Sequence, residues 1–344
     1  MDSLTQDADR HARTHAVQRF GRDGMTGSAL RVAYRGEPAA TLLDAPHTLA
    51  VLDFGTAGDR LSDSRHLQIP LPALGTSAPR ECWSVDAAVV HGAEGALRWA
   101  AGGGWRFVAV EIDEAAYGGI EVASARAYDA LLAQVATFPE KHLQRIWNYL
   151  GAINGGDGDD ERYRLFCNGR ARGLAAHGIT RYPAATAIGH HGRKGLLQVY
   201  ALCAMEPGRA LENPRQVSAW KYPRQYGPTA PSFARAMRLP GGALAISGTA
   251  AVVGHASYHV GDVAAQADEA VANLRTLLEQ AALPAFDASS PLKVYVRRPQ
   301  DAGQIAAALA RHLDPSVPRI LLQGDICRSE LLVEIDGWRF GKSE

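Results

Sequence analysis

The clearest hydrophobic periodicity lies in the C-terminal third of the chain. Apolar residues recur three and four positions apart between Val263 and Ala281, which predicts an amphipathic helix that Asp262 caps. A second, alanine-rich helix is expected at 304–313. Short apolar or alternating segments predict strands at 243–247, 292–298, 319–326 and 330–338. The order strand–helix–strand–helix–strand–strand favours a mixed sheet with its helices on one face.

The middle of the chain shows less regular patterns. In the segment RFVAVEI the two valines and the isoleucine form the more apolar face of an alternating pattern, so we expect a strand with that face in the core. A helical stretch is expected from about Ala125 to Trp147, interrupted near Pro139.

A weak internal repeat links the two halves. The segments RIWNYL, ERYRLFCNGRARGLAAHG and YPAATAIGHHGRKGLLQVYALC echo LKVYVRR, QIAAALARHL and VPRILLQGDICRSELLVEID near the C-terminus. The later copy carries an acid at Glu334, where the earlier copy offers only Val199 or Tyr200. We therefore predict an α/β (α+β) protein of two related units, with one active site at their interface.

Prolines concentrate between 207 and 231, which is typical of an irregular connector between folded units. The first residues are polar and charged, so we expect a flexible tail there. The predicted organisation is a tail at 1–27, an N-terminal unit at 28–206, the connector at 207–231 and a C-terminal unit at 232–344.

Composition excludes some classes of partner. Among 344 residues, 36 Lys and Arg balance 36 Asp and Glu, so no overall field attracts nucleic acid or an anionic membrane. No apolar run is long enough to span a bilayer, and the first residues lack the apolar segment of a signal peptide. Four scattered cysteines without a CxxC pair are typical of free thiols in a cytoplasmic protein.

Glu334 is a candidate proton donor because it lies in the apolar strand segment LLVEI. A carboxyl group there is partly removed from water, which raises its pKa and suits it to general acid catalysis. The alternative is a surface glutamate at a sheet edge, which is the commoner fate of this residue type. The sequence pattern favours neither interpretation over the other.

Two arginines fall on otherwise apolar faces. Arg170 lies on the apolar face of a helix predicted at 160–177, together with Tyr163, and Arg235 shares a strand face with apolar neighbours in SFARAM. A buried guanidinium needs an anionic partner. A structural ion pair is the usual outcome, but two such arginines near tyrosines also suit a ligand with two carboxylates.

Other polar residues give weaker signals. Lys293, Tyr295 and Arg297 share one face of a predicted strand, which we expect to face solvent, although a place in the site stays open. His255 and His259 are four residues apart, but the glycines around them favour a loop, so no metal site is expected. The glycine-rich segments lack the spacing of dinucleotide and P-loop sites.

The ordered motifs resemble those of the chorismatases, and the segment 244–338 resembles the reactive-intermediate-deaminase (Rid) fold. The motifs span most of the chain: WNYLGAIN, ERYRLFCNGRA, PAATAIG, ENP, YPRQYGP, FARA, ISGTA, LKVYVRR and GDICRSELLVEIDG. The resemblance implies two Rid-like or chorismate-mutase-like units, each a mixed sheet with helices on one face, and a site for chorismate without metal or organic cofactor. It places the acid at Glu334 and the substrate contacts at Tyr163, Arg170, Tyr222 and Arg235.

Two positions suggest which product is formed. Family members that hydrolyse chorismate carry alanines in the motifs ISATA and DIAR, whereas this chain has Gly248 and Cys327. It thus resembles the type that forms 3-hydroxybenzoate, in some cases with 4-hydroxybenzoate, plus pyruvate. In that type Cys327 assists opening of a ring intermediate and Gly248 leaves room for the substrate. The alternatives are an imine or enamine deaminase of the Rid type and a non-catalytic binder of aromatic or keto acids. Either a monomer or a small homo-oligomer is expected.

Overall fold

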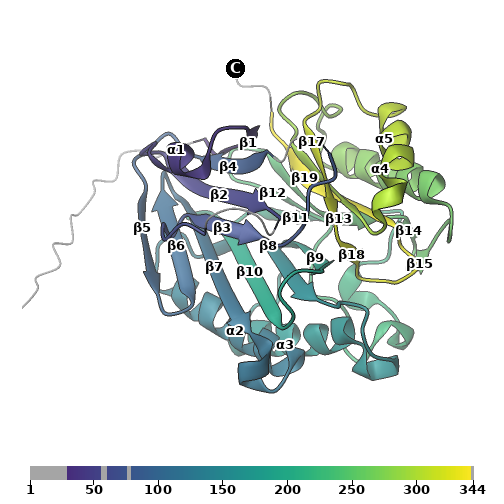
Figure 1. The fold of residues 1–344 in the computed structure, drawn as a ribbon, viewed down its shortest axis with the longest axis horizontal. Coiled ribbons are helices and arrows are strands. Elements are labelled where there is room, and N and C mark those ends of the chain that lie inside the picture. The colour runs from purple at the N-terminus through teal and green to yellow at the C-terminus, as the bar shows by residue number, and fades with distance from the viewer. Residues whose placement is uncertain (1–28, 56–59, 76–78, 342–344) are drawn as a thin grey trace, which may run out of the picture.

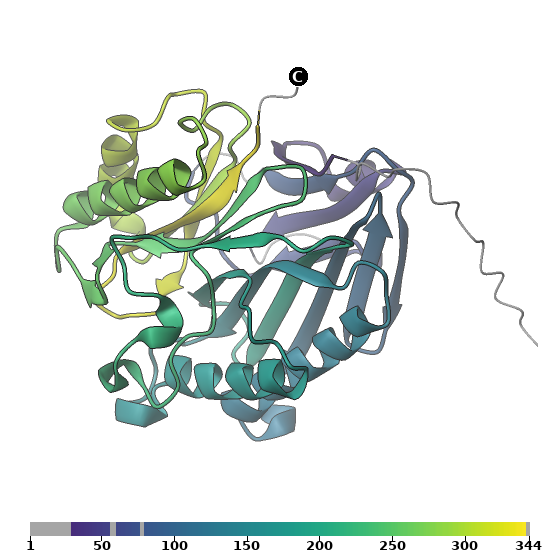
Figure 2. The same cartoon turned by 180° about the vertical axis from the view of Figure 1, so that it is seen from behind.

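The computed structural model describes residues 29–55, 60–75 and 79–341 (Figure 1). Three larger sheets make up most of this part, and two pairs of helices pack on the outside of two of the sheets (Figures 1 and 2). No helix in these ranges is long and apolar enough to cross a bilayer. The expected tail at 1–27 lies outside the described residues, and the boundaries between units stay a prediction.

The N-terminal sheet has four strands in the order β1-β4-β2-β3. Its elements are β1 (Arg31–Arg35), α1 (Ala39–Leu43), β2 (Thr48–Phe54), β3 (His66–Ile69) and β4 (Arg80–Ser84).

The second sheet has seven strands in the order β18-β9-β8-β10-β7-β6-β5, with α2 and α3 on its outer face. Its strands are β5 (Val90–Glu94), β6 (Leu97–Gly102), β7 (Trp105–Asp113), β8 (His142–Gly151), β9 (Ala184–His190), β10 (Leu196–Ala204) and β18 (Asp325–Ile326). The helices are α2 (Ile120–Ala136) and α3 (Arg162–Ala176), with short 3₁₀ helices at Glu114–Tyr117 and Gly158–Asp160.

The third sheet has six strands in the order β11-β12-β13-β19-β16-β17, with α4 and α5 on its outer face. Its strands are β11 (Arg209–Leu211), β12 (Ala236–Arg238), β13 (Leu244–Ala250), β16 (Leu292–Val296), β17 (Arg319–Gln323) and β19 (Val333–Arg339). The remaining elements are α4 (Val263–Gln280), α5 (Ala302–Ala310), the hairpin β14 (Val252–Val253) and β15 (Ala256–Ser257), and 3₁₀ helices at Ala219–Lys221, Arg224–Tyr226 and Pro299–Asp301.

The predicted repeat is visible in the topology. The series β7-α2-β8-α3-β9-β10 and β13-α4-β16-α5-β17-β19 have equivalent strand orders, β9-β8-β10-β7 and β17-β16-β19-β13. In both units two parallel strands, β8 with β9 and β16 with β17, lie beside an antiparallel last strand. The prediction of two mixed sheets with helices on one face is therefore confirmed.

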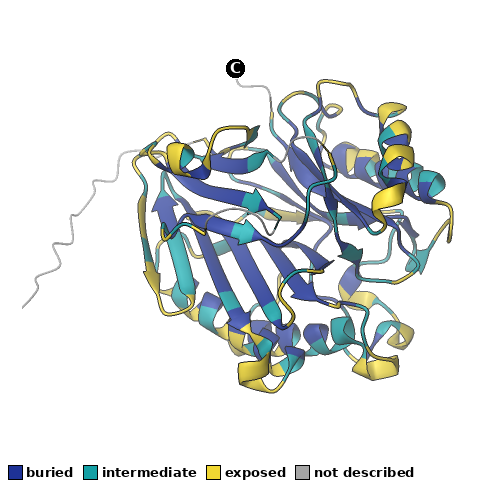
Figure 3. Ribbon diagram, viewed as in Figure 1, coloured by how far each residue is buried: buried dark blue, intermediate teal, exposed yellow. Residues whose placement is uncertain are grey.

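The inner faces of the three sheets meet in a central core (Figure 3). Trp83, Trp147, Tyr200 and Trp338 pack against one another there, and Trp147 stacks on Tyr200 with ring centroids 4.9 Å apart. Each helix pair covers a second apolar layer on the opposite side of its sheet. Both main sheets are thus covered on two faces, which is why nearly every residue of their central strands is buried.

Burial on two faces explains two errors of the sequence interpretation. The helix expected up to Trp147 ends at Ala136, and the segment after Pro139 forms β8 instead. In β8, Trp147 faces the central core while Ile146 and Leu150 face the helices, so the period of two is hidden. The strand RFVAVEI was expected to have one core face, yet Phe107 on its other face is fully buried as well.

Helix α3 lies unusually close to α2 because two of its residues are glycines. A Cβ atom at Gly169 would lie 2.0 Å from the carbonyl oxygen of Glu121, and one at Gly173 would lie 2.5 Å from Cβ of Tyr128. Neither position has space for a side chain, so this close approach fixes where α3 sits relative to the sheet.

We expect Gly169→Ala to destabilise the protein, because the added methyl group overlaps backbone atoms of α2. Overpacking of this kind costs about 1–3 kcal/mol. The matched control is Gly303→Ala in α5, where a Cβ atom meets nothing within 4 Å. Alanine has the higher helix propensity, so that variant is expected to be unchanged or more stable by up to about 1 kcal/mol. Thermal and urea unfolding of both variants measure the difference; equal stability would contradict the packing argument.

Candidate active site

A cavity of about 470 Å³ opens between the seven-stranded and six-stranded sheets. Its walls come from α3, β9, β13, β19 and the loops 216–235 and 327–331. All seven residues singled out from the sequence line it: Tyr163, Arg170, Tyr222, Arg235, Gly248, Cys327 and Glu334. Residues that are far apart in the sequence therefore share one site at the interface of the two units.

Glu334 is a buried carboxyl group on an interior strand. β19 pairs with β13 on one side and β16 on the other, so the sheet-edge interpretation does not apply. Val333 and Ile335 face the helices, and Glu334 lies on the opposite face with Asp336. Burial, reinforced by the negative charge of Asp336, raises the pKa of Glu334 to about 8. The group is thus protonated near neutral pH and able to donate a proton.

Gly248 is essential to the placement of that carboxyl group. A Cβ atom at position 248 would lie 1.9 Å from Oε1 of Glu334 and 2.7 Å from its Cδ. An alanine there forces the glutamate side chain to move. The missing methyl group thus makes room first for the acid itself.

Arg170 and Arg235 hold their guanidinium groups at the cavity without an ion pair to any carboxylate among the described residues. Arg170 donates to the carbonyl oxygen of Ser232 at 2.6 Å, and its buried Nε has no hydrogen-bond partner in the described part of the chain. Arg235 donates to the hydroxyl group of Tyr222 at 2.6 Å and to the carbonyl oxygen of Val217 at 2.9 Å. The structural ion pair that the sequence left open is absent from this part of the chain. Two buried cations that form no ion pair with any described residue make the cavity suitable for a dianion.

Tyr163 and Cys327 line the cavity as uncharged side chains. Tyr163 stacks on Phe166 with centroids 6.2 Å apart, and burial raises its pKa well above the ordinary value. Burial and the neighbouring Glu334 raise the pKa of Cys327 to about 12, so this side chain is a neutral thiol rather than a nucleophilic thiolate. A thiol can still donate a weak hydrogen bond.

Comparison with known proteins assigns the family. A family model described as "Chorismatase FkbO/Hyg5-like, N-terminal" matches residues 81–203. A 3-hydroxybenzoate synthase from Streptomyces hygroscopicus is 34% identical over 290 residues, covering 79% of this chain and 84% of the relative. The chain belongs to the chorismatase family. A chorismatase from Streptomyces rapamycinicus is 35% identical over 274 residues, covering 75% of this chain and 81% of that protein.

The fold agrees with this assignment. A crystal structure of a chorismatase matches with a TM-score of 0.80 and 32% identity, covering 91% of this chain and 98% of that one. The fold of the chorismatase family therefore extends over most of the chain.

The face that carries Lys293, Tyr295 and Arg297 was wrongly expected to meet solvent. Lys293 and Tyr295 are buried against Asp336, and neither they nor Arg297 line the cavity of this chorismatase-family protein. Arg297 instead stabilises the loop that carries Cys327. It donates hydrogen bonds to the backbone carbonyl groups of Ile326, Arg328 and Leu331. The error arose because solvent exposure of a strand face depends on the partner sheet, which the local pattern does not reveal.

Three residues of the site escaped the sequence interpretation. Arg328 lines the cavity and lies 4.0 Å from the ring centroid of Tyr226, and Thr186 lines the opposite wall. Asp336 lies behind Glu334 on the same strand face. For Asp336 a signal existed, because it stands two positions after Glu334 in LLVEIDG. A single hydroxyl group in the apolar segment PAATAIG was the corresponding signal for Thr186.

We expect Glu334→Gln to change how stability depends on pH. Between the unfolded value near 4.5 and the folded pKa of about 8, the native state binds one more proton at Glu334 than the unfolded state does. The contribution of Glu334 to the free energy of unfolding therefore falls by about 1.4 kcal/mol for each unit that the pH rises across that window. The glutamine variant lacks this decline. Urea unfolding at several pH values measures it, with Glu94→Gln on the exposed strand β5 as control. Parallel wild-type and Glu334→Gln curves would show that the carboxyl group titrates normally.

Proposed function

We propose that the protein converts chorismate into pyruvate and 3-hydroxybenzoate, and that 4-hydroxybenzoate is at most a minor product. The family assignment supports this proposal, as does the name of the 3-hydroxybenzoate synthase that is 34% identical. The observation that carries it most directly is the combination of a protonated buried acid at Glu334 with two arginines, Arg170 and Arg235, that lack carboxylate partners among the described residues.

In this proposal Glu334 acts as a general acid. Chorismate carries two carboxylates and an enolpyruvyl ether, and protonation of the methylene carbon of that ether gives an oxocarbenium-like centre. The bond from the ring to the ether oxygen then breaks and pyruvate leaves. Carbon protonation is slow, so an acid that stays protonated near neutral pH suits the step.

The other cavity residues would bind and orient the substrate. Arg170 and Arg235 would pair with the carboxylates, and Tyr163 and Tyr222 would flank the ring. Chorismate contains the same atoms as 3-hydroxybenzoate plus pyruvate, so the conversion requires no oxidant, reductant or net water. The ring hydroxyl oxygen would take the place of the departing ether oxygen, and the neutral thiol of Cys327 would assist opening of the resulting intermediate.

We also propose a cytoplasmic location, for which the four unpaired cysteines are the support. The oligomeric state stays a prediction.

The first test is incubation of the purified protein with chorismate and separation of the products. We expect equal amounts of pyruvate and 3-hydroxybenzoate, with a rate that falls as the pH rises through about 8, where Glu334 loses its proton. Glu334→Gln keeps the shape of the side chain but has no proton to transfer, so kcat is expected to fall about 100-fold or more with little change in binding. Binding of chorismate without pyruvate release would indicate a non-catalytic binder, and turnover of imines instead would indicate a deaminase.

The second test concerns the product. We expect Gly248→Ala together with Cys327→Ala to shift the product from 3-hydroxybenzoate toward a non-aromatic dihydroxy acid. The alanine at 248 displaces the carboxyl group of Glu334, and the alanine at 327 removes the thiol. Cys327→Ala alone shows whether the thiol has a role of its own. If the thiol only fills space, its removal leaves the product unchanged. Chromatography of the products decides between these outcomes. An unaltered 3-hydroxybenzoate fraction in the double variant would show that these positions do not set the product.

A further inference from the structure

The strand that carries Gly248 is irregular at the active site. β13 and β19 pair in register on both sides, but Ser247 and Gly248 together lie opposite Asp336. This arrangement is a β-bulge, which takes backbone groups out of the hydrogen-bonded ladder and re-aims neighbouring side chains. The N–H of Gly248 thus needs an acceptor from outside its own sheet, because an unpaired buried N–H is costly.

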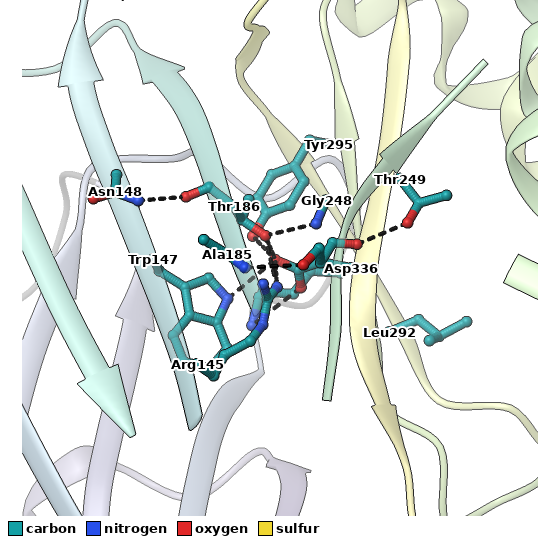
Figure 4. Close-up of polar contacts among 12 residues, drawn as sticks. Arg145, Trp147, Asn148, Ala185, Thr186, Gly248, Thr249, Leu292, Tyr295 and Asp336 are labelled. Carbon is teal, nitrogen blue, oxygen red and sulfur yellow. Dashed lines mark hydrogen bonds and ion pairs between the residues drawn. The ribbon is translucent and has the colours of Figure 1, made fainter. Parts of the chain in front are cut away.

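Thr186, in β9 of the other sheet, supplies that acceptor (Figure 4). Its Oγ1 accepts from the backbone N–H of Gly248 at 3.0 Å and from Nη2 of Arg145 at 2.6 Å. The same hydroxyl group donates to Oδ2 of Asp336 at 2.8 Å. A threonine hydroxyl has one hydrogen and two lone pairs, so its full capacity is used here.

Two of these three bonds hold residues that lie beside Glu334. The backbone of Gly248 lies against the carboxyl group of Glu334, where even a methyl group does not fit. Asp336 is the charged group nearest in sequence to Glu334 on the same strand face, and Thr186 holds both residues from the opposite sheet. The hydroxyl group of Thr186 therefore links Gly248 and Asp336, the two residues beside Glu334, to the first unit. That unit also carries Arg170.

We propose that Thr186 is a positioning residue of the active site, which aligns Glu334 with the substrate bound in the cavity. The proposal rests on the proposed function. Thr186 acts through Gly248 and Asp336, and its hydroxyl group is the part that matters rather than its bulk.

Thr186→Val tests this directly, because valine has nearly the shape of threonine but neither donates nor accepts. The N–H of Gly248 and the guanidinium group of Arg145 then lose an acceptor, and the bulge is free to shift. A displacement of about 1 Å in a reacting group can cost up to about 100-fold in rate. We expect kcat for pyruvate release to fall about 10- to 100-fold with KM little changed, and Thr186→Ser to recover most of the loss.

Two further variants distinguish a positioning role of Thr186 from a general effect on the stability of the protein. Thr48→Val makes the same chemical change at a threonine in β2 that is equally buried and donates to the carbonyl oxygen of Leu42. It is expected to lower the melting temperature without lowering kcat. If Thr186→Val does not fold, Thr186→Cys replaces it, because a thiol is a weak donor and acceptor; its kcat is then expected to lie well below that of Thr186→Ser.

Four outcomes would overturn the inference. A higher KM with normal kcat in Thr186→Val would make the residue a substrate contact, since it also lines the cavity. A lower melting temperature with normal kcat would make it merely structural. Failure of Thr186→Ser to recover activity, or a kcat for Thr186→Cys equal to that of Thr186→Ser, would show that the hydroxyl group is not the determinant. Wild-type protein that releases no pyruvate would refute the proposed function instead, so the two failures are distinguishable.

Discussion

The structure depends on a cluster of four buried charges that joins all three sheets. Glu81 comes from β4, Arg145 from β8, Lys293 from β16 and Asp336 from β19, and none of their side chains is more than 1% exposed. Nζ of Lys293 lies 2.6 Å from Glu81 and 3.5 Å from Asp336, and Arg145 lies 3.1 Å from Asp336. Burying an ion costs several kcal/mol, so loss of any member leaves an uncompensated charge. The cluster thus favours the observed docking of the sheets, because that docking brings the four charges together.

The same cluster determines the chemistry of the neighbouring site. Oδ2 of Asp336 accepts hydrogen bonds from Trp147, Thr186 and Tyr295. Oδ1 has no hydrogen-bond partner among the described residues and lies 3.5 Å from Nζ of Lys293. Although burial alone lowers the pKa of Lys293, Asp336 and Glu81 raise it above its ordinary value, so Lys293 stays charged. Burial and the neighbouring Asp336 raise the pKa of Glu334 to about 8, so this carboxyl group keeps its proton near neutral pH. The buried ion cluster and the protonated carboxyl group of Glu334 are therefore parts of one arrangement.

The two related units contribute different parts of the site. In the first unit, α3 carries Tyr163 and Arg170, and the inner face of the last strand, β10, carries apolar and aromatic groups such as Tyr200 that fill the central core. In the second unit the corresponding strand is β19, which carries Glu334 and Asp336 on that face. Because α3 of the first unit and β19 of the second unit both line the cavity, its shape depends on how the two sheets dock.

The sequence by itself determined the elements whose signals are local. The helical period of α4 and its Asp262 cap are set by neighbouring residues, as is the order of strands and helices in the C-terminal unit. The ordered motifs also identified seven residues that line the cavity, because a motif is defined by residue types and their spacing, which can be read from the sequence. The repeat was visible because both units must bury equivalent faces.

Only the tertiary structure decided which faces are buried and which groups meet. β8 looked helical because both its faces are covered, and Lys293 looked exposed because its partner Glu81 is more than two hundred residues away in the sequence. The space that Gly248 leaves for Glu334 exists only once the bulge of β13 has formed against β19. Whether Arg170 meets a carboxylate or faces an open cavity depends likewise on long-range packing. Desolvation and pairing of charges are properties of the assembled sheets, so no local pattern contains them.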